Sequence, residues 1–201
     1  MKSGVSARLS ITAYENLISA AERRLIINKE KDTTLRISDF IGIIPSITGK
    51  VELVYEGEQE GPAKVAHYLI GKAIRTQFVK YFPDPEKFKR TPESSPYFKV
   101  QQWFRKGNYL DILADLTNKD HETVLQGVPG LYDLVKKFHA KAEEQTRLFL
   151  MEFALHGMAE YSILSKHIIE SGLKFRDLLT SMLSAEEKER GYSHFNDEDI
   201  F

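Results

Sequence analysis

The segment between Pro62 and Pro83 constrains the fold most, because its apolar residues repeat at helical spacing between two prolines. Proline is tolerated in the first turn of an α-helix but disrupts its interior. The apolar stripe consists of Val65, Leu69, Ile70, Ala73, Ile74 and Phe78. We therefore expect an amphipathic helix that begins at Pro62, ends before Pro83 and buries one face against other elements.

Helical spacing recurs on both sides of this segment, and paired strands do not. A first helix is predicted after Ser3-Gly4, and Ser38 is expected to cap a short helix that Pro45 interrupts. The β-like run Val51 to Tyr55 has no hairpin partner. Further helices are predicted after Ser95-Pro96, after Asn108 (carrying Leu110, Leu113 and Leu116), from Leu131 to Met158 with a break at Gly157, and after Ser171-Gly172. The predicted fold class is all-α.

The proline-rich stretch from residue 83 to residue 95 divides the chain. Pro83, Pro85 and Pro92 stand there among charged and small polar residues, a composition typical of linkers. We predict a boundary near residue 90, with domains at 1–90 and 91–201. The last residues, 186–201, are charged and lack a sustained period, so we expect them to fray or to await a partner.

Composition excludes several classes of protein. The 28 Lys and Arg residues balance 29 Asp and Glu residues, which gives no reason to expect a nucleic acid or an anionic membrane as partner. The chain has no cysteine, which removes disulfides and thiolate metal sites and suits a reducing compartment. The N-terminus has no signal-peptide pattern, and the apolar run Phe40 to Ile44 is too short to cross a bilayer. We expect a soluble, cytoplasmic protein.

No phosphate-binding loop is present at the one place that suggests one. Gly49-Lys50 has the required pair, but Ile44 holds the position of the first glycine and Val51 that of the metal-binding hydroxyl. A basic stretch, Lys72 to Arg90, has aromatic residues between its cations, yet no nucleic-acid motif accompanies it. A solvated helix face is the favoured interpretation of that stretch.

Glu152, His156 and Glu160 form a ladder at spacing four on one predicted helix face. Such a ladder could bind a divalent metal and support a metal-dependent helical-bundle enzyme. Carboxylate bundle sites usually space Glu and His by three, however, so a surface or interhelical polar cluster is favoured. We predict no metal site. His121-Glu122 begins like a zinc-protease motif, but Leu125 holds the place of the second histidine.

Arg8 lies early in the first predicted helix. A cation there is mildly unfavourable for the helix dipole and is most often a surface charge. The alternative is an anion site, because free amides and a guanidinium fork both favour phosphate.

Two segments resemble a known family. Ser3-Gly4-Val5-Ser6-Ala7-Arg8-Leu9-Ser10 resembles the opening of the helical lid in AAA+ ATPases of the magnesium-chelatase and MoxR clade, where the motif ends in the sensor-2 arginine. The stretch from Gly42 to Gly71 is similar to bacterial magnesium-chelatase-like proteins. The resemblance covers residues 3 to about 80 and continues weakly towards Lys166. It implies a helical lid-type bundle at 1–90, followed by a larger helical extension.

The resemblance further implies that Arg8 contacts the γ-phosphate of ATP held by a preceding nucleotide-binding domain. ATP and Mg²⁺ would be cofactors of the full-length parent, and this chain alone would bind none and be inactive, because it has no Walker A or Walker B sequence. Implied partners are that domain, a ring of identical subunits and a von Willebrand factor A-type protein. The extension at 96–201 would contact the partner. A helix that starts almost at residue 5 is also what a domain cut from a longer protein would show. The alternative is a free-standing helical adaptor.

Overall fold

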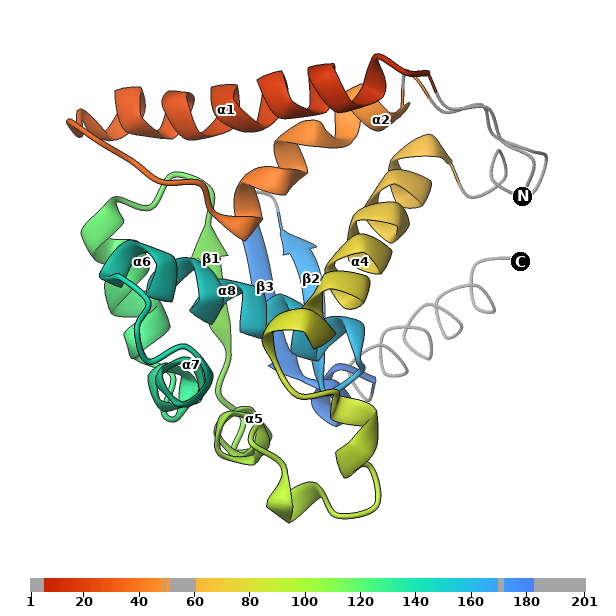
Figure 1. The fold of residues 1–201 in the computed structure, drawn as a ribbon, viewed down its shortest axis with the longest axis vertical. Coiled ribbons are helices and arrows are strands. Elements are labelled where there is room, and N and C mark those ends of the chain that lie inside the picture. The colour runs from red at the N-terminus through yellow and green to blue at the C-terminus, as the bar shows by residue number, and fades with distance from the viewer. Residues whose placement is uncertain (1–5, 49, 51–60, 170–171, 183–201) are drawn as a thin grey trace, which may run out of the picture.

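The computed structural model describes residues 6–48, 50, 61–169 and 172–182. One long helix, α1, lies across one end of the molecule, α4 runs along one side, and α8 lies in front of a small sheet (Figure 1). None of the described helices is both long and apolar enough to cross a membrane. In chain order the elements are α1 (Leu9–Asn28), η1 (Ile37–Ile43), α2 (Ile44–Thr48), α4 (Pro62–Tyr81), η2 (Pro85–Phe88), η3 (Pro92–Ser94), α5 (Phe98–Arg105), β1 (Leu110–Leu113), α6 (Asn118–Gln126), α7 (Leu131–Phe138), α8 (Glu144–Glu160), β2 (Leu164–Ile169) and β3 (Gly172–Asp177).

Three of the predicted helices are confirmed. Helix α4 begins at Pro62 and ends at Tyr81, two residues before Pro83. Helix α1 occupies the first periodic segment, and α5 follows Ser95-Pro96. Ser38 does not cap its helix, because it lies inside the 3₁₀-helix η1, whose N-cap residue is Arg36. The β-like run 51–55 and the tail 186–201 fall outside the described residues.

The all-α prediction is wrong, because the chain forms a three-stranded antiparallel sheet in the order β1-β3-β2. The predicted helix around Leu110 is strand β1, in which Leu110 and Ile112 are buried and alternate with more exposed residues. Alternation with period two is the mark of a half-buried strand. The spacing of Leu110 and Leu113 fits a helix equally well, and Leu113 proves to be exposed. The fold is mixed α and β, with most of it helical.

The first part of the predicted last helix is also a strand, and residues 178–182 after it are helical. Gly172 opens β3, the central strand, and β3 pairs with both β1 and β2. A Cβ at Gly172 would lie 2.2 Å from the carbonyl oxygen of Ile112, so glycine here permits a close approach of two backbones. The residues between β2 and β3, Glu170 and Ser171, lack the Asn-Gly or Asp-Gly pair that predicts a hairpin.

The long helix predicted from Leu131 is two helices. Helix α7 ends at Phe138 and α8 begins at Glu144, whereas Gly157 lies inside α8 without breaking it. Gly157 instead makes room for Phe78 of α4, because a Cβ there would lie 2.0 Å from the Cδ2 atom of that ring. The glycine therefore lets α4 and α8 pack closely.

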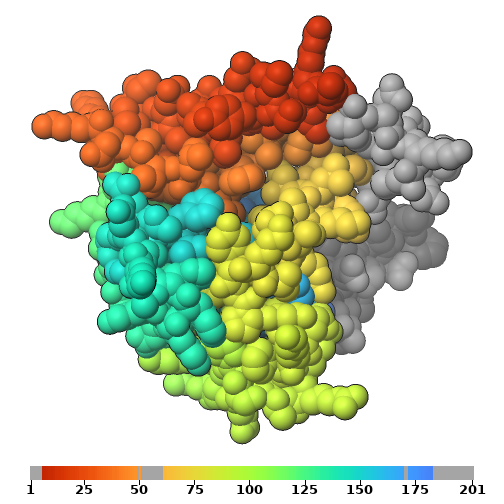
Figure 2. All heavy atoms as spheres, in the orientation of Figure 1, coloured from red at the N-terminus to blue at the C-terminus, as the bar shows by residue number. Residues whose placement is uncertain are grey.

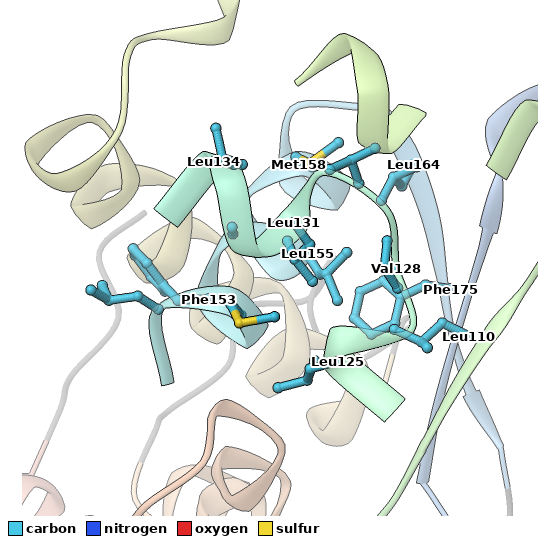
Figure 3. Packing of buried hydrophobic residues seen from close by; sticks show 14 of the residues in the cluster. Leu110, Leu125, Val128, Leu131, Leu134, Phe153, Leu155, Met158, Leu164 and Phe175 are labelled. Carbon is cyan, nitrogen blue, oxygen red and sulfur yellow. The ribbon is translucent and has the colours of Figure 1, made fainter. Parts of the chain in front are cut away.

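A hydrophobic core lies between α8, the sheet and the surrounding helices. Figure 3 shows side chains from α7, α8 and the sheet converging on it, among them Leu131, Leu155, Met158, Leu164 and Phe175. The ring of Phe78 packs against Tyr97 and Phe153, with ring centroids 5.8 Å apart in both pairs. The core thus includes residues on both sides of position 90, and the division into two domains stays a prediction.

Substituting Gly157 tests this packing. Gly157→Ala should lower the free energy of unfolding by about 2 kcal/mol, because overpacking costs more than the gain in helix propensity. Gly127→Ala is the control, since its added Cβ would come no closer than 3.3 Å to the carbonyl oxygens of Thr123 and Val124. Urea denaturation measures both variants. Equal stability of the two would contradict the close contact of α4 and α8.

Candidate functional site

Arg8 immediately precedes the first residue of α1 and occupies its N-cap position. Its amide donates to Ser6 Oγ at 3.3 Å, and its carbonyl accepts from Thr12 Oγ1 at 3.0 Å. The side chain is exposed, and no residue in the described part of the chain pairs with its guanidinium. The guanidinium is therefore available to an anion from outside these residues.

A buried arginine fastens the other half of α1. Arg24 is 1% exposed and forms an ion pair with Asp39 of η1. Its second terminal nitrogen donates to Thr33 Oγ1 at 3.0 Å and to the carbonyl of Thr34 at 2.7 Å. Asp39 also accepts from the amide of Arg36 at 2.8 Å, which satisfies the start of η1. Burial raises the pKa of the Asp39 carboxyl, against the lowering effects of the Arg36 amide and the Arg24 charge.

The carboxylate of Glu152, on α8, is completely buried against the same short helix. One oxygen accepts from the amide of Ser38 at 2.7 Å, and the other accepts from the amide of Ile37 at 3.2 Å. These amides belong to the first turn of η1, where no partner exists within the helix. His121 Nε2 lies 3.1 Å from the second oxygen. Glu152 thus caps a helix from which it is separated by more than 100 residues of sequence.

The environment keeps Glu152 ionised. Burial by itself raises the pKa of its carboxyl, but the hydrogen bond and charge of His121, the charge of His156 and the Ser38 amide outweigh it. Together they lower the pKa to about 2. The carboxylate is therefore charged at neutral pH, and its charge faces two backbone dipoles.

His156 lies one turn beyond Glu152 on α8, with Nε2 3.9 Å from the nearer carboxylate oxygen. Both ring nitrogens are buried, and neither has a hydrogen-bond partner among the described residues. The ring packs edge-on against Phe175, with centroids 5.2 Å apart. Burial, with the charge of Lys166, lowers the pKa of His156 to about 3 against the opposing charge of Glu152. The imidazole is therefore neutral at pH 7.

Arg36 extends this network to the connection between β1 and α6. Its guanidinium donates to the carbonyl of Leu116 at 2.8 Å and to Asn118 Oδ1 at 3.1 Å. The amide of Asn118 donates in turn to Glu30, near the end of α1, at 2.7 Å. Burial and the charge of Arg24 lower the pKa of Arg36 to about 10, which leaves it charged at neutral pH. We call Arg24, Arg36, Asp39, His121 and Glu152 the buried polar network.

The ladder identified in the sequence does not converge on one point. Glu152 turns to η1, whereas Glu160 forms an ion pair with Lys166 at 2.6 Å. No group of three His, Asp or Glu residues within the described ranges could hold a metal ion. His121 was noted in the sequence only as part of an incomplete zinc-protease motif. In the structure its ring contacts the carboxylate of Glu152.

The network's other charges were missed in the sequence, although one signal was present. Arg24 follows Leu17 and Ala21 on one face of α1, which places a cation in an apolar stripe. Arg24, His121 and Glu152 have 5% or less of their surface exposed. Their contacts join α1, η1, α6 and α8.

No protein-family model, no curated protein and no solved structure matches this chain.

Glu152→Gln should lower the free energy of unfolding by about 3 kcal/mol, because the amide offers one acceptor oxygen where the carboxylate has two. Glu160→Gln is the matched control on the same helix. Its ion pair with Lys166 is partly exposed, so the expected loss is at most about 1 kcal/mol. Chemical denaturation at pH 7 checks both. A similar small loss for the two variants would show that Glu152 is not the cap of η1.

The pH dependence of stability tests His156. Its pKa is lowered from 6.5 to about 3, so below pH 6.5 the unfolded chain binds a proton that the folded protein does not. The folded state therefore has its full stability above pH 6.5 and loses stability as the pH falls towards 3. Glu152 contributes in the same direction below pH 4.5, its ordinary pKa. We expect His156→Leu to remove roughly 1 kcal/mol per pH unit of slope between pH 6 and pH 5. Thermal unfolding across this range measures the slope, and an unchanged slope would refute a neutral, buried His156.

Proposed function

We propose that this chain is the C-terminal, non-catalytic part of an AAA+ ATPase of the magnesium-chelatase-like type, in which Arg8 senses ATP. The observation that carries the proposal is the position of Arg8 on α1. Its exposed side chain stands at the beginning of α1, which Asn16 and Ser46 join to α2, and the far half of the helix is held by the buried Arg24–Asp39 ion pair. The Arg8 side chain can thus contact a nucleotide from a helix that is held to the body of the protein in both of its halves.

Helix α1 is suited to transmit a displacement. It has 20 residues and is about 30 Å long, and Arg24 lies about 24 Å from Arg8 along it. Asp39 and Glu152 then connect α1 through η1 to α8, which crosses the sheet and the core. A shift of Arg8 would therefore reach the C-terminal half of the chain as a rigid-body motion.

The role of Arg8 follows from the chemistry of the guanidinium group. Its planar fork can donate two hydrogen bonds to the γ-phosphate of ATP. Its positive charge stabilises the negative charge on the phosphoryl group while that group is transferred. In this proposal the nucleotide, Mg²⁺ and the remaining catalytic groups belong to a preceding nucleotide-binding domain. The parent protein would form a ring in the cytoplasm and act on a protein partner, with a von Willebrand factor A-type protein as a candidate.

Arg8→Ala in the complete ATPase should reduce ATP turnover by on the order of tenfold or more, because an anchored cation near the transferred phosphoryl group is lost. Arg23→Ala is the matched control on the same helix, since Arg23 makes an exposed ion pair with Asp115 at 3.2 Å. Steady-state phosphate release measures both. Unchanged turnover in the Arg8 variant, with the control also normal, would remove the sensor role.

A free-standing helical adaptor is the second candidate. The observation in its favour is an apolar groove between α4 and α8, which suits a protein contact without any nucleotide. The coding sequence before residue 3 distinguishes the two. The ATPase proposal requires Walker A and Walker B motifs there. A coding sequence that starts at Met1 would rule it out, and the adaptor would be the remaining candidate.

A further inference from the structure

The apolar groove has a volume of about 930 Å³. It lies where η1 and α2, α4 and the start of α8 meet, and Figure 2 shows these segments, in orange, yellow and teal, together on one face. Each contributes one side of a helix. The apolar lining includes Ile37, Ile47, Leu69, Ile74, Phe149 and Phe153. Three apolar helix faces around one hollow leave room for a further segment.

The groove has two chemically different ends. One end is formed by Leu9, Ile47 and Leu69 and carries no charged lining residue. The other is formed by Tyr81, His139 and Lys141, and Lys141 is the one charged residue of the described lining. The two ends are about 18 Å apart, the rise of α4 from Leu69 to Tyr81.

Further cations surround the basic end. Lys80 precedes Tyr81, and Lys137 precedes Phe138, a lining residue over whose ring its ammonium lies 5.5 Å from the centroid. The carboxylate of Glu144, at the start of α8, is already paired with Arg147 at 2.7 Å. The groove is therefore complementary to an apolar segment that carries several carboxylates.

The chain itself contains such a segment beyond the described residues. Phe195-Asn196-Asp197-Glu198-Asp199-Ile200-Phe201, which we call the tail motif, has apolar side chains at both ends and three consecutive acids between them. The acids match the basic end of the groove, and the aromatic residues match its apolar lining.

The connection is long enough for the tail motif to reach the groove of its own chain. Residues 183–194 follow the last described residue, and they can span up to about 40 Å when extended. A folded chain of this size has a radius of gyration of only about 16 Å. The linker is therefore about as long as the molecule is wide, which reaches a neighbouring face but not halfway around the circumference. Within that reach, tethering gives an effective concentration of about a millimolar.

We propose that the groove between α4 and α8 is a docking site for the tail motif of the same chain, with Lys141 facing its carboxylates. This proposal is independent of the ATPase assignment. In this arrangement the tail motif occupies the groove. Another acidic, apolar segment could bind there only by displacing the tail motif.

The absence of native cysteine allows a direct test in the full chain. Thr146→Cys places a thiol on an exposed lining residue near the basic end, and Glu198→Cys places one in the tail motif. The control pair replaces Thr146→Cys with Gln102→Cys, an exposed position on α5 outside the groove. We expect the groove pair to form its disulfide about tenfold faster than the control pair, at a rate independent of protein concentration.

Charge reversal separates docking from simple proximity. Lys141→Glu should slow the groove pair about threefold, as expected for a partly exposed charge contact, and leave the control pair unchanged. Adding Asp199→Lys to Lys141→Glu should restore the rate. Circular dichroism checks that all variants keep their fold.

Three outcomes would overturn the proposal. Equal rates for the groove and control pairs would show that the tail does not dwell in the groove. A rate that rises with protein concentration would assign the contact to a second copy. Faster capture of Thr146→Cys by Glu56→Cys than by Glu198→Cys would assign the groove to the segment 51–60, which also combines acids with apolar residues.

Discussion

The carboxylate of Glu152 governs how the halves of this chain fit together. Moving an ion out of water costs several kcal/mol, and the cost is tolerable only if hydrogen bonds replace the lost hydration. The amides of Ile37 and Ser38 and the ring of His121 supply them. Since those amides begin η1, the same contacts fix that short helix on α8. Asp39 of η1 then receives Arg24, and α1 takes its place from this ion pair.

Helices bounded by proline could be predicted from the sequence, because the signal is local. Pro62 and Pro83 limit α4, and one stripe of apolar residues tells which face is buried. The sheet could not be predicted in this way. Leu110 and Leu113 satisfy a helical as well as an extended pattern, and the choice is made by pairing with β3, more than 50 residues later. The close backbone approach at Gly172 belongs to that pairing.

The polar residues were predictable only in part, for a related reason. Spacing four along the chain places Glu152 and His156 on one helix face, and both do lie together inside the protein. The same spacing says nothing about His121 or the amides of η1, which come from other elements. Glu160 shares the spacing and still pairs elsewhere, with Lys166. Periodicity identifies a face, whereas the partners on that face depend on the tertiary fold. Arg24 was missed although it stands in an apolar stripe of α1, and that stripe could not have named Asp39 as its partner.

The central claim is that η1 couples α1 to α8 through buried charges. A double-mutant cycle between Arg24→Met and Glu152→Gln tests it most directly, because the two side chains share no contact and meet only through η1. The coupling account predicts that the two losses of unfolding free energy differ from additivity by about 1 kcal/mol or more. Additivity within about 0.3 kcal/mol would contradict it, since independent sites add in this way.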